Sequence, residues 1–129
     1  MGPKILILGG SGFIGSAFAR ELASRGADFG SISRSQCDYT RFENILSLLK
    51  KGKPELVINC SGVAGVPSVD WCETHRNETV RVNLLAAAAM SNACYATGTL
   101  LGNISTGCVY DGQRPLDAPW TEDDPPNFS

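Results

Sequence analysis

The stretch Ile5-Leu6-Ile7-Leu8-Gly9-Gly10-Ser11-Gly12-Phe13-Ile14-Gly15 decides the fold of this chain. Its first four residues predict a buried strand, because short aliphatic runs are typical of strands covered on both faces. Gly9, Gly12 and Gly15 follow the strand at a spacing of three, and an apolar helical pattern follows them. In a strand–turn–helix unit, such glycines permit a tight turn, a close approach of backbone to a pyrophosphate, and close packing of helix on strand. Because the helix N-terminus also offers free N–H groups, the stretch predicts dinucleotide binding. A glycine-rich turn without a ligand is the alternative.

The rest of the chain alternates helical and strand patterns. Strands are expected over 27–33, 56–60 and 99–104, and helices over 13–25, 42–52 and 76–96, with a turn or short helix start over 66–73. The order β-α-β-α-β-α-β predicts a parallel sheet with right-handed crossovers and helices on both faces. We therefore expect an α/β fold, Rossmann-like with three layers (α/β/α), and incomplete, with about four strands.

Two local features refine the helices. Thr40-Arg41-Phe42-Glu43 fits a capping box at the start of the second helix. The third helix has small and aliphatic residues at helical spacing, which predicts close packing on the sheet. These residues are Val80, Leu84, Ala87, Ala88 and Ala93.

Residues 1–110 are expected to form the dinucleotide-binding domain, and residues 111–129 an irregular segment. Four of the seven prolines lie in this second stretch, together with five acidic residues. It has neither helical nor strand periodicity, so it is typical of a loop that leads into a further part of a protein.

Composition excludes several classes of protein. The chain has 129 residues, 43% hydrophobic content and a net charge of −2, which gives no basic footprint for nucleic acid. No apolar stretch approaches membrane-spanning length, and Met1–Lys4 leads directly into the first strand, so we expect no signal peptide and a cytoplasmic location. The five cysteines are an odd, scattered set and are expected to be free thiols. Cys72 and His75 have ligand-like spacing, but no second cysteine pair accompanies them, so no metal site is expected.

The end of the second strand bears on cofactor choice. An acidic residue there would bind the 2′-hydroxyl of NAD, whereas an arginine accommodates the 2′-phosphate of NADP. Ser33-Arg34 occupies this position, and Asp38 is the first acid after it. The sequence therefore favours NADP(H) over NAD(H), with a solvated loop arginine as the alternative.

Further stretches carry a resemblance to a known family. Asn59-Cys60-Ser61-Gly62, Asn83 and Ser105-Thr106-Gly107, added to the glycine motif, resemble the extended short-chain dehydrogenase/reductases. Val69-Asp70-Trp71-Cys72-Glu73 and Thr106-Gly107-Cys108 resemble the dTDP-4-dehydrorhamnose reductase branch. Within that branch the chain is most similar to the bifunctional 3,5-epimerase/4-reductases that make nucleotide-linked rhamnose. The resemblance covers nearly the whole chain.

The resemblance implies a reaction and a set of residues. NADPH would deliver hydride to the C4 ketone of a nucleotide-linked 4-keto-6-deoxyhexose, with Thr106 as a hydroxyl that donates to the developing alkoxide. Cys108 would act as an acid/base in epimerisation at C3 and C5, because protons α to a ketone are acidic enough for a thiolate. Val66, Thr106 and Gly107 would contact the substrate. The expected cofactor-binding residues are Gly9, Ser11, Gly12, Phe13, Ile14, Gly15, Ser33, Arg34, Asp38, Tyr39, Cys60, Ser61, Gly62, Val63 and Asn83.

The family's Tyr-x-x-x-Lys pair is expected shortly after Ser129, where this sequence stops, and Tyr110 has no lysine four residues on. We therefore expect the cofactor portion of an enzyme, with no turnover alone. Three alternatives stay open: a structural role for Cys108 as a small apolar residue, a plain 4-keto reductase without epimerisation, and a non-catalytic homologue of the methionine adenosyltransferase regulatory-subunit type. A nucleotide sugar is the expected partner, and an uncovered last strand makes a homo-oligomer possible.

Overall fold

Four parallel strands form the centre of the fold. The structure, a computed structural model, describes residues 2–105 and 109–127. The strands β1 (Ile5–Leu8), β2 (Phe29–Ile32), β3 (Leu56–Asn59) and β4 (Leu100–Asn103) pair in the order β2-β1-β3-β4. Their registers place Leu8 opposite both Ile32 and Asn59, and Asn59 opposite Asn103. All four strands therefore end at one level, and the segments that follow them meet at one edge of the sheet.

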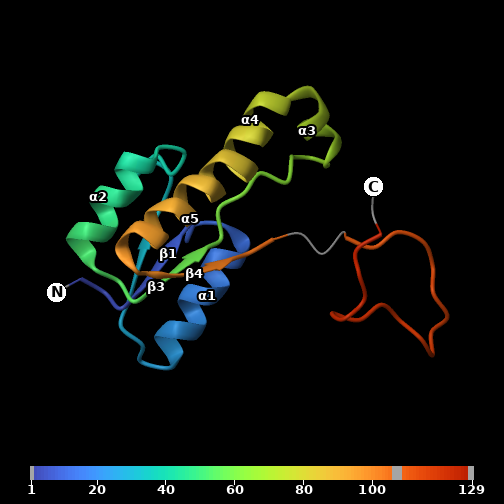
Figure 1. Cartoon of the computed structure of the whole chain (residues 1–129), viewed down its shortest axis with the longest axis horizontal. Coiled ribbons are helices and arrows are strands. Elements are labelled where there is room, and N and C mark those ends of the chain that lie inside the picture. Colours follow the sequence, from blue (N-terminus) through green and yellow to red (C-terminus); the bar gives the residue numbers. More distant parts are fainter. Residues whose placement is uncertain (1, 106–108, 128–129) are drawn as a thin grey trace.

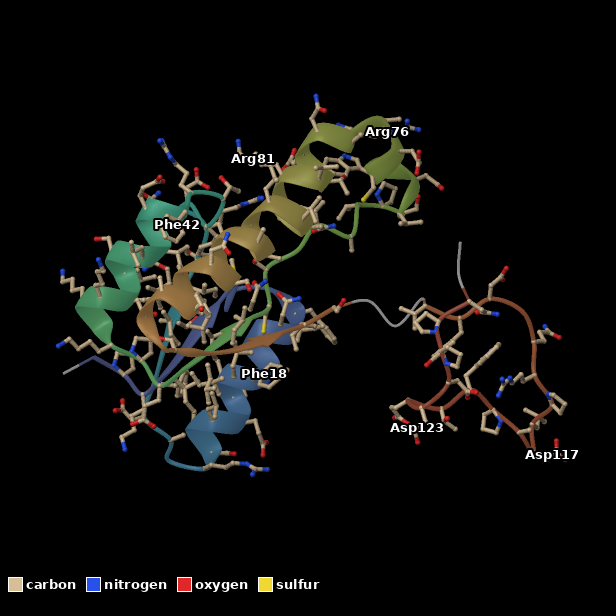
Figure 2. All side chains as sticks on the ribbon, viewed as in Figure 1. Phe18, Phe42, Arg76, Arg81, Asp117 and Asp123 are labelled. Atoms are coloured by element: carbon tan, nitrogen blue, oxygen red, sulfur yellow. The ribbon has the colours of Figure 1, made fainter. Side chains whose placement is uncertain are left out.

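Helices cover both faces of this sheet. α1 (Phe13–Ser24) packs on one face, whereas α2 (Phe42–Gly52) and α5 (Ala86–Thr97) pack side by side on the other (Figure 1). Figure 2 shows Phe18 of α1 and Phe42 of α2 on opposite sides of the sheet. The predicted α/β, three-layer, Rossmann-like fold with four parallel strands is confirmed. β2, β3 and β4 are shorter than the expected ranges, because the residues at the ends of those ranges lie outside the paired registers.

The main core lies between the sheet and the α2–α5 pair. It contains the side chains of Leu6, Leu8, Tyr39, Ile45, Leu49, Val57, Ala86, Met90, Ala93 and Cys94. Small residues on α5 allow the helix to approach the sheet, as the alanine-rich sequence predicts. Within the described residues, no helix has both the length and the apolar content needed to cross a membrane.

The expected single helix over 76–96 contains a break in its hydrogen-bond pattern. It starts as α4 (Arg76–Val80), widens into the π-helical turn η1 (Arg81–Leu85), and continues as α5. The short helix α3 (Asp70–Thr74) precedes it, after a cis peptide bond between Val66 and Pro67. A π-helical turn adds one residue to a turn, so it rotates the face that the preceding helix presents.

The expected packing of this helical segment needs a correction at three residues. Val80 and Leu84 are 49% and 60% exposed, and Ala88 is also exposed, so their predicted packing on the sheet is wrong. Ala86, Ala89 and Ala93 are buried instead. The buried residues of the segment follow ordinary helical spacing from Val82 through Ala86 and Ala89 to Ala93, and Val80, Leu84 and Ala88 lie outside this apolar stripe.

The predicted capping box at Thr40 is wrong as well. Arg41 occupies the cap position of α2 and caps no N–H group with its side chain. The Thr40 hydroxyl donates to Asp38 Oδ1 at 2.7 Å, and the Thr40 N–H donates to the same oxygen at 3.1 Å. Thr40 therefore belongs to a turn centred on Asp38 and does not cap α2.

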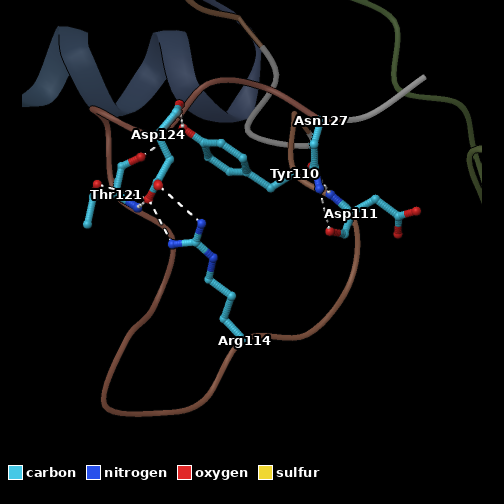
Figure 3. Close-up of polar contacts among 6 residues, drawn as sticks. All are labelled: Tyr110, Asp111, Arg114, Thr121, Asp124 and Asn127. Carbon is cyan, nitrogen blue, oxygen red and sulfur yellow. Dashed lines mark hydrogen bonds and ion pairs between the residues drawn. The ribbon is translucent and has the colours of Figure 1, made fainter.

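Residues 109–127 contain neither helix nor strand, but their side chains form an ordered network. The ring of Trp120 stacks on Tyr110 at 4.8 Å between centroids, and the Arg114 guanidinium lies 3.8 Å from the Trp120 ring. The Asp124 carboxylate accepts hydrogen bonds from Thr121 N–H at 2.8 Å and from Arg114 Nη1 at 3.2 Å (Figure 3). The loop is therefore fixed by its own side chains rather than by a packed element.

Candidate functional site

The glycine turn between β1 and α1 has little room for side chains. Gly9 has φ +81°, and a Cβ on it would lie 2.7 Å from Ser61 N. A Cβ on Gly15 would meet the Gly9 carbonyl oxygen, and it would lie 2.7 Å from Gly10 Cα. The first and third glycines are therefore required by the close approach of the turn, the loop after β3 and helix α1. This matches two of the three roles that the sequence predicts.

Gly12 is in a different position. Its backbone is extended (φ −77°, ψ 172°), it is the N-cap residue of α1, and a Cβ on it would meet only Gly9 O at 3.3 Å. No side chain caps α1, and its first turn contains no acidic residue. The first-turn N–H groups have no partner within the helix, so this end of α1 offers donors and a positive dipole end to an anion.

Tyr39 ties the glycine turn to the end of β2. It is 2% exposed; its hydroxyl donates to the Ile32 carbonyl oxygen and accepts from Gly9 N–H at 3.1 Å. Burial raises the pKa of Tyr39 above its ordinary value, and the Gly9 hydrogen bond opposes this effect in part. Tyr39 therefore acts as a neutral buried anchor for the turn.

A cavity of about 170 Å³ opens over this turn. Its walls are Gly9, Ser11, Gly12, Arg34, Tyr39, Cys60, Ser61 and Gly62. All eight belong to the set of cofactor-binding residues predicted from the sequence. The fold thus gathers residues from the ends of β1, β2 and β3 around one hollow, because parallel strands end at one edge.

The loop after β3 is held from both sides. Asn59, 3% exposed, donates through Nδ2 to Asn103 Oδ1 at 2.7 Å and accepts from Ser61 N–H at 2.9 Å. On the other side, Asn83 Oδ1 accepts from Val63 N–H, and Asn83 Nδ2 donates to Val63 O, both at 2.8 Å. Asn83, expected to contact the cofactor, is thus observed to clamp the loop.

A larger cavity of about 660 Å³ lies beyond this loop. Its lining residues include Asn59, Ser61, Val63, Cys72, Thr79, Asn83, Asn103, Ile104 and Ser105. Ser61 borders both cavities, so they adjoin at the end of β3. Thr106, Gly107 and Cys108, the expected catalytic and substrate-binding residues after β4, lie outside the described residues.

Other expected site residues lie apart from these cavities. The side chains of Phe13 and Ile14 are 91% and 44% exposed. Only the backbone N–H groups of these two residues, in the first turn of α1, face the expected anion site. Val66 is 83% exposed and lines neither cavity. The Ser33 N–H donates to Gln36 Oε1 at 2.8 Å, which fixes the turn after β2.

Asp38 also lies apart from the glycine-turn cavity. Hydrogen bonds from the Thr40 hydroxyl and N–H lower the pKa of Asp38, and the charges of Arg81 and Arg41 add to this effect. The carboxylate is thus occupied by its own turn, although it lies close enough to Arg81 to feel its charge.

Sequence reasoning missed the two asparagines that end β3 and β4, and Cys72 and Thr79 in the wall of the larger cavity. A signal for the asparagines was present, since Asn59 and Asn103 each close an apolar strand and parallel strands end together. Nothing in the sequence pattern brought Thr79 to the same wall, because this depends on how α3 and α4 fold back.

Among the described residues, the thiols and the single histidine form no metal-binding cluster. Burial raises the pKa of Cys37, Cys60 and Cys94, so these thiols stay protonated. The His75 ring stacks on Trp71 at 3.8 Å, and its Nδ1 lies 2.9 Å from Thr74 Oγ1. In residues 2–105 and 109–127, no three metal-ligating side chains come together.

Comparison with known proteins adds to this geometry. The RmlD substrate binding domain family matches residues 3–128. The chain belongs to this family. A bifunctional dTDP-4-dehydrorhamnose 3,5-epimerase/dTDP-4-dehydrorhamnose reductase of Arabidopsis thaliana is 34% identical over 98% of this chain and 42% of the relative. A dTDP-4-dehydrorhamnose reductase of Streptomyces griseus is 30% identical over 95% of this chain and 39% of the relative.

Solved structures of similar proteins agree with this RmlD-family assignment. A UDP-rhamnose synthase from Acanthamoeba polyphaga mimivirus superposes with a TM-score of 0.84 at 26% identity, over 100% of this chain and 47% of that one. A Bacillus anthracis dTDP-4-dehydrorhamnose reductase in complex with NADP gives a TM-score of 0.77 at 25% identity, over 89% of this chain and 40% of that one. This chain spans less than half the length of these relatives.

Proposed function

We propose that this chain binds NADP(H) as the cofactor-binding portion of a nucleotide-sugar 3,5-epimerase/4-reductase. The observation that carries the proposal is the cavity over the glycine turn, which opens at the uncapped N-terminus of α1 and is bordered by Arg34. An RmlD-family relative of known structure holds NADP, and the family's named members include both reductases and bifunctional enzymes.

The residues present fit a dinucleotide. The pyrophosphate would lie at the first turn of α1, where Gly12 leaves space and N–H groups are free. Arg34, at the end of β2, would face the adenosine ribose. The larger cavity beyond Ser61 would receive the nicotinamide side of the cofactor and the sugar. It lies at the carboxyl ends of β3 and β4, whereas the glycine-turn cavity lies at those of β1, β2 and β3.

A bound nicotinamide would supply the hydride that reduces the C4 ketone of the sugar. The residues of this chain would orient the sugar and the cofactor, and would donate hydrogen bonds or protons to the sugar. The Thr106 hydroxyl would donate a hydrogen bond to the oxygen that gains charge at C4. Gly107 and Val66 would contact the sugar, and the Asn83 clamp would keep the 61–65 loop in place beneath the cofactor.

Epimerisation is the second part of the proposal, and it depends on Cys108. At C3 and C5, a thiolate at this position would take the proton α to the ketone from one face of the sugar, and a second acid/base group would donate a proton to the same carbon from the opposite face. The bifunctional Arabidopsis relative supports this reading. A plain reductase, like the Streptomyces relative, would need no such thiol.

Cofactor binding is tested by titrating the chain with NADPH and NADH and following nicotinamide fluorescence. We expect saturable binding with preference for NADPH. Gly12→Asp tests the site sharply, because an aspartate is a favourable N-cap and keeps α1, while its charge repels the pyrophosphate. Gly12→Asn is the matched neutral control and is expected to bind more tightly than Gly12→Asp. Equal binding by Gly12→Asp and the parent chain would refute the pyrophosphate site.

Epimerase chemistry is tested in a protein that joins this chain to the remaining C-terminal part of the Arabidopsis relative. The substrate is incubated in deuterated water, and deuterium uptake at C3 and C5 is measured by NMR. Cys108→Ser is expected to abolish uptake while NADPH binding persists. Unchanged uptake in Cys108→Ser would refute the role of Cys108 in epimerisation, whereas no uptake in the parent protein would assign the chain to the plain reductases.

A further inference from the structure

A third cavity, of about 370 Å³, lies beside the glycine turn on the side of α4. It is lined by Arg34, Asn77, Glu78, Arg81 and Val82. Arg34 also borders the cavity over the glycine turn. The third cavity therefore adjoins the position where an adenosine ribose is expected, but its far wall comes from α4 and η1 rather than from β2.

The charges in this cavity are poorly matched to one another. Arg34 Nη1 lies 3.9 Å from Glu78 Oε1, and both side chains are about half exposed, so the pair is long and easily exchanged. In the described part of the chain, Arg81 has no carboxylate within ion-pair distance. By contrast, Arg76 on the same helical segment pairs with Glu73 at 2.7 Å. The cavity thus has two guanidinium groups and one carboxylate.

The π-helical turn explains how Arg81 reaches this position. η1 begins at Arg81, and the Ala86 N–H donates to the Arg81 carbonyl oxygen across the widened turn. The same turn contains Asn83, which clamps the loop under the cofactor site. Figure 2 shows Arg81 near the start of α2, whereas Arg76 lies farther away, beside α3. Widened turns of this kind are often found at functional sites, because they redirect side chains.

We propose that Arg34 and Arg81 together bind the adenosine 2′-phosphate of NADP(H), and that Glu78 holds Arg34 until the phosphate displaces it. This inference rests on the proposed cofactor binding and assigns its specificity to two residues outside β2. A 2′-phosphate carries nearly two negative charges at neutral pH, so two guanidinium groups match it better than one. The charge that Arg81 exerts on Asp38 agrees with its position near the 34–39 turn.

If the phosphate displaces Glu78 from Arg34, the Glu78 carboxylate should lower the affinity for the 2′-phosphate. This carboxylate neutralises Arg34 in the empty protein and repels an incoming phosphate, so it opposes phosphate binding. Removing the charge should therefore improve affinity. If Glu78 instead accepted a hydrogen bond from a ribose hydroxyl, removing its charge would weaken the binding of every adenosine ligand.

The test uses isothermal titration calorimetry of this chain with 2′,5′-ADP (adenosine 2′,5′-bisphosphate) and with 5′-AMP, which differ only in the 2′-phosphate. Arg81→Gln is expected to weaken 2′,5′-ADP binding by about 10-fold and to change 5′-AMP binding less than about twofold. Glu78→Gln is expected to tighten 2′,5′-ADP binding by about threefold. Arg76→Gln is the matched control, since it removes a charge from the same helix outside this cavity, and is expected to change neither ligand.

Two outcomes would overturn the inference. One is Arg81→Gln binding 2′,5′-ADP as tightly as the parent chain; the other is Glu78→Gln weakening both ligands. Either result would leave the proposed cofactor site standing, provided that the parent chain binds 5′-AMP and Gly12→Asp does not. If the parent chain bound neither ligand, the proposed function would fail, and this inference with it.

Discussion

Asn83 in η1 and Val63 in the loop after β3 exchange two hydrogen bonds, each of 2.8 Å, across 20 residues of sequence. The side-chain amide of Asn83 satisfies both the N–H and the carbonyl group of Val63, which lies in the loop beneath the proposed cofactor site. A loop of small residues has little packing of its own, so this contact fixes its shape.

Asn83→Ala is therefore expected to act on affinity as well as on stability. Loss of two partly exposed hydrogen bonds should lower the free energy of unfolding by about 1–2 kcal/mol, measured in urea. The freed loop should weaken NADPH binding by about 5–10-fold, because ordering it would oppose binding. Asn92→Ala on exposed α5 surface is the control and should leave both unchanged. NADPH binding unaffected by Asn83→Ala would show that the clamp does not shape the site.

Gly15 of the glycine motif should be a structural position that tolerates no side chain. Gly15→Ala is expected to destabilise the protein by about 2–3 kcal/mol, because its Cβ would meet the backbone of Gly9 and Gly10. Gly26→Ala should cost only about 1 kcal/mol, since it has φ +64° but open space around it. Urea unfolding of both variants checks this order, and a Gly15→Ala protein as stable as Gly26→Ala would contradict it.

Tyr39→Phe should lower stability and remove a pH dependence. Losing the hydroxyl that bridges Ile32 O and Gly9 N–H is expected to cost about 1–2 kcal/mol at pH 7. Because burial raises the pKa of Tyr39 in the folded state, the neutral phenol stabilises the fold below the unfolded pKa of about 10. This stabilisation is lost as the pH rises through the folded pKa.

The measurement is the free energy of unfolding between about pH 8 and about pH 11, a range that spans the unfolded tyrosine pKa of about 10. Tyr95→Phe, at a side chain 91% exposed, is the control and should keep the parent's decline. A Tyr39→Phe protein with the same alkaline decline as the parent would assign that decline to other groups.

The 109–127 loop should loosen in acid through Asp124. Hydrogen bonds from Thr121, with the nearby charge of Arg114, hold the pKa of Asp124 below its usual value. The ordered loop is therefore favoured above the ordinary aspartate pKa of about 4, and this contribution is lost as pH falls through the lower, folded value. Trp120 fluorescence, recorded in a Trp71→Phe background, should shift in this range.

Asp124→Asn should give the acid-form fluorescence already at neutral pH. Asp117→Asn, at an exposed site in the same loop, is the matched control and should behave like the parent. If Asp124→Asn retained the neutral-pH emission of the parent, the carboxylate would have no role in ordering Trp120.

Sequence reasoning reached the fold because the decisive information was local. The aliphatic run before Gly9 and the small-residue loop after β3 each define a strand end, and alternation of helix and strand implies a parallel sheet. All eight residues around the glycine-turn cavity belong to the predicted cofactor-binding set, in which the family resemblance supplied residues such as Tyr39 that no local pattern marks. The Asp38–Thr40 turn escaped, because a capping pattern and an aspartate-centred turn compete for the same threonine.

The parts that escaped prediction depend on long-range geometry. No residue pattern marks Arg81 as the start of a π-helical turn, and its position in the third cavity follows only from the folded helix. The network around Trp120 is similar: its partners Tyr110, Arg114 and Asp124 have no periodic spacing, so only the chain's path brings them together.

The common level at which the four strands end has a practical consequence. Every group assigned to the site follows a carboxyl end of a strand, or lies on a segment that reaches this edge. The turns at the opposite edge are short, and the one at Gly26 is exposed, with nothing within 4 Å of an added Cβ. A tag, a fluorophore or new chain termini engineered at Gly26 would therefore sit on the far side of the protein from the ligand. That position makes it the natural attachment point for immobilising the chain in a binding assay.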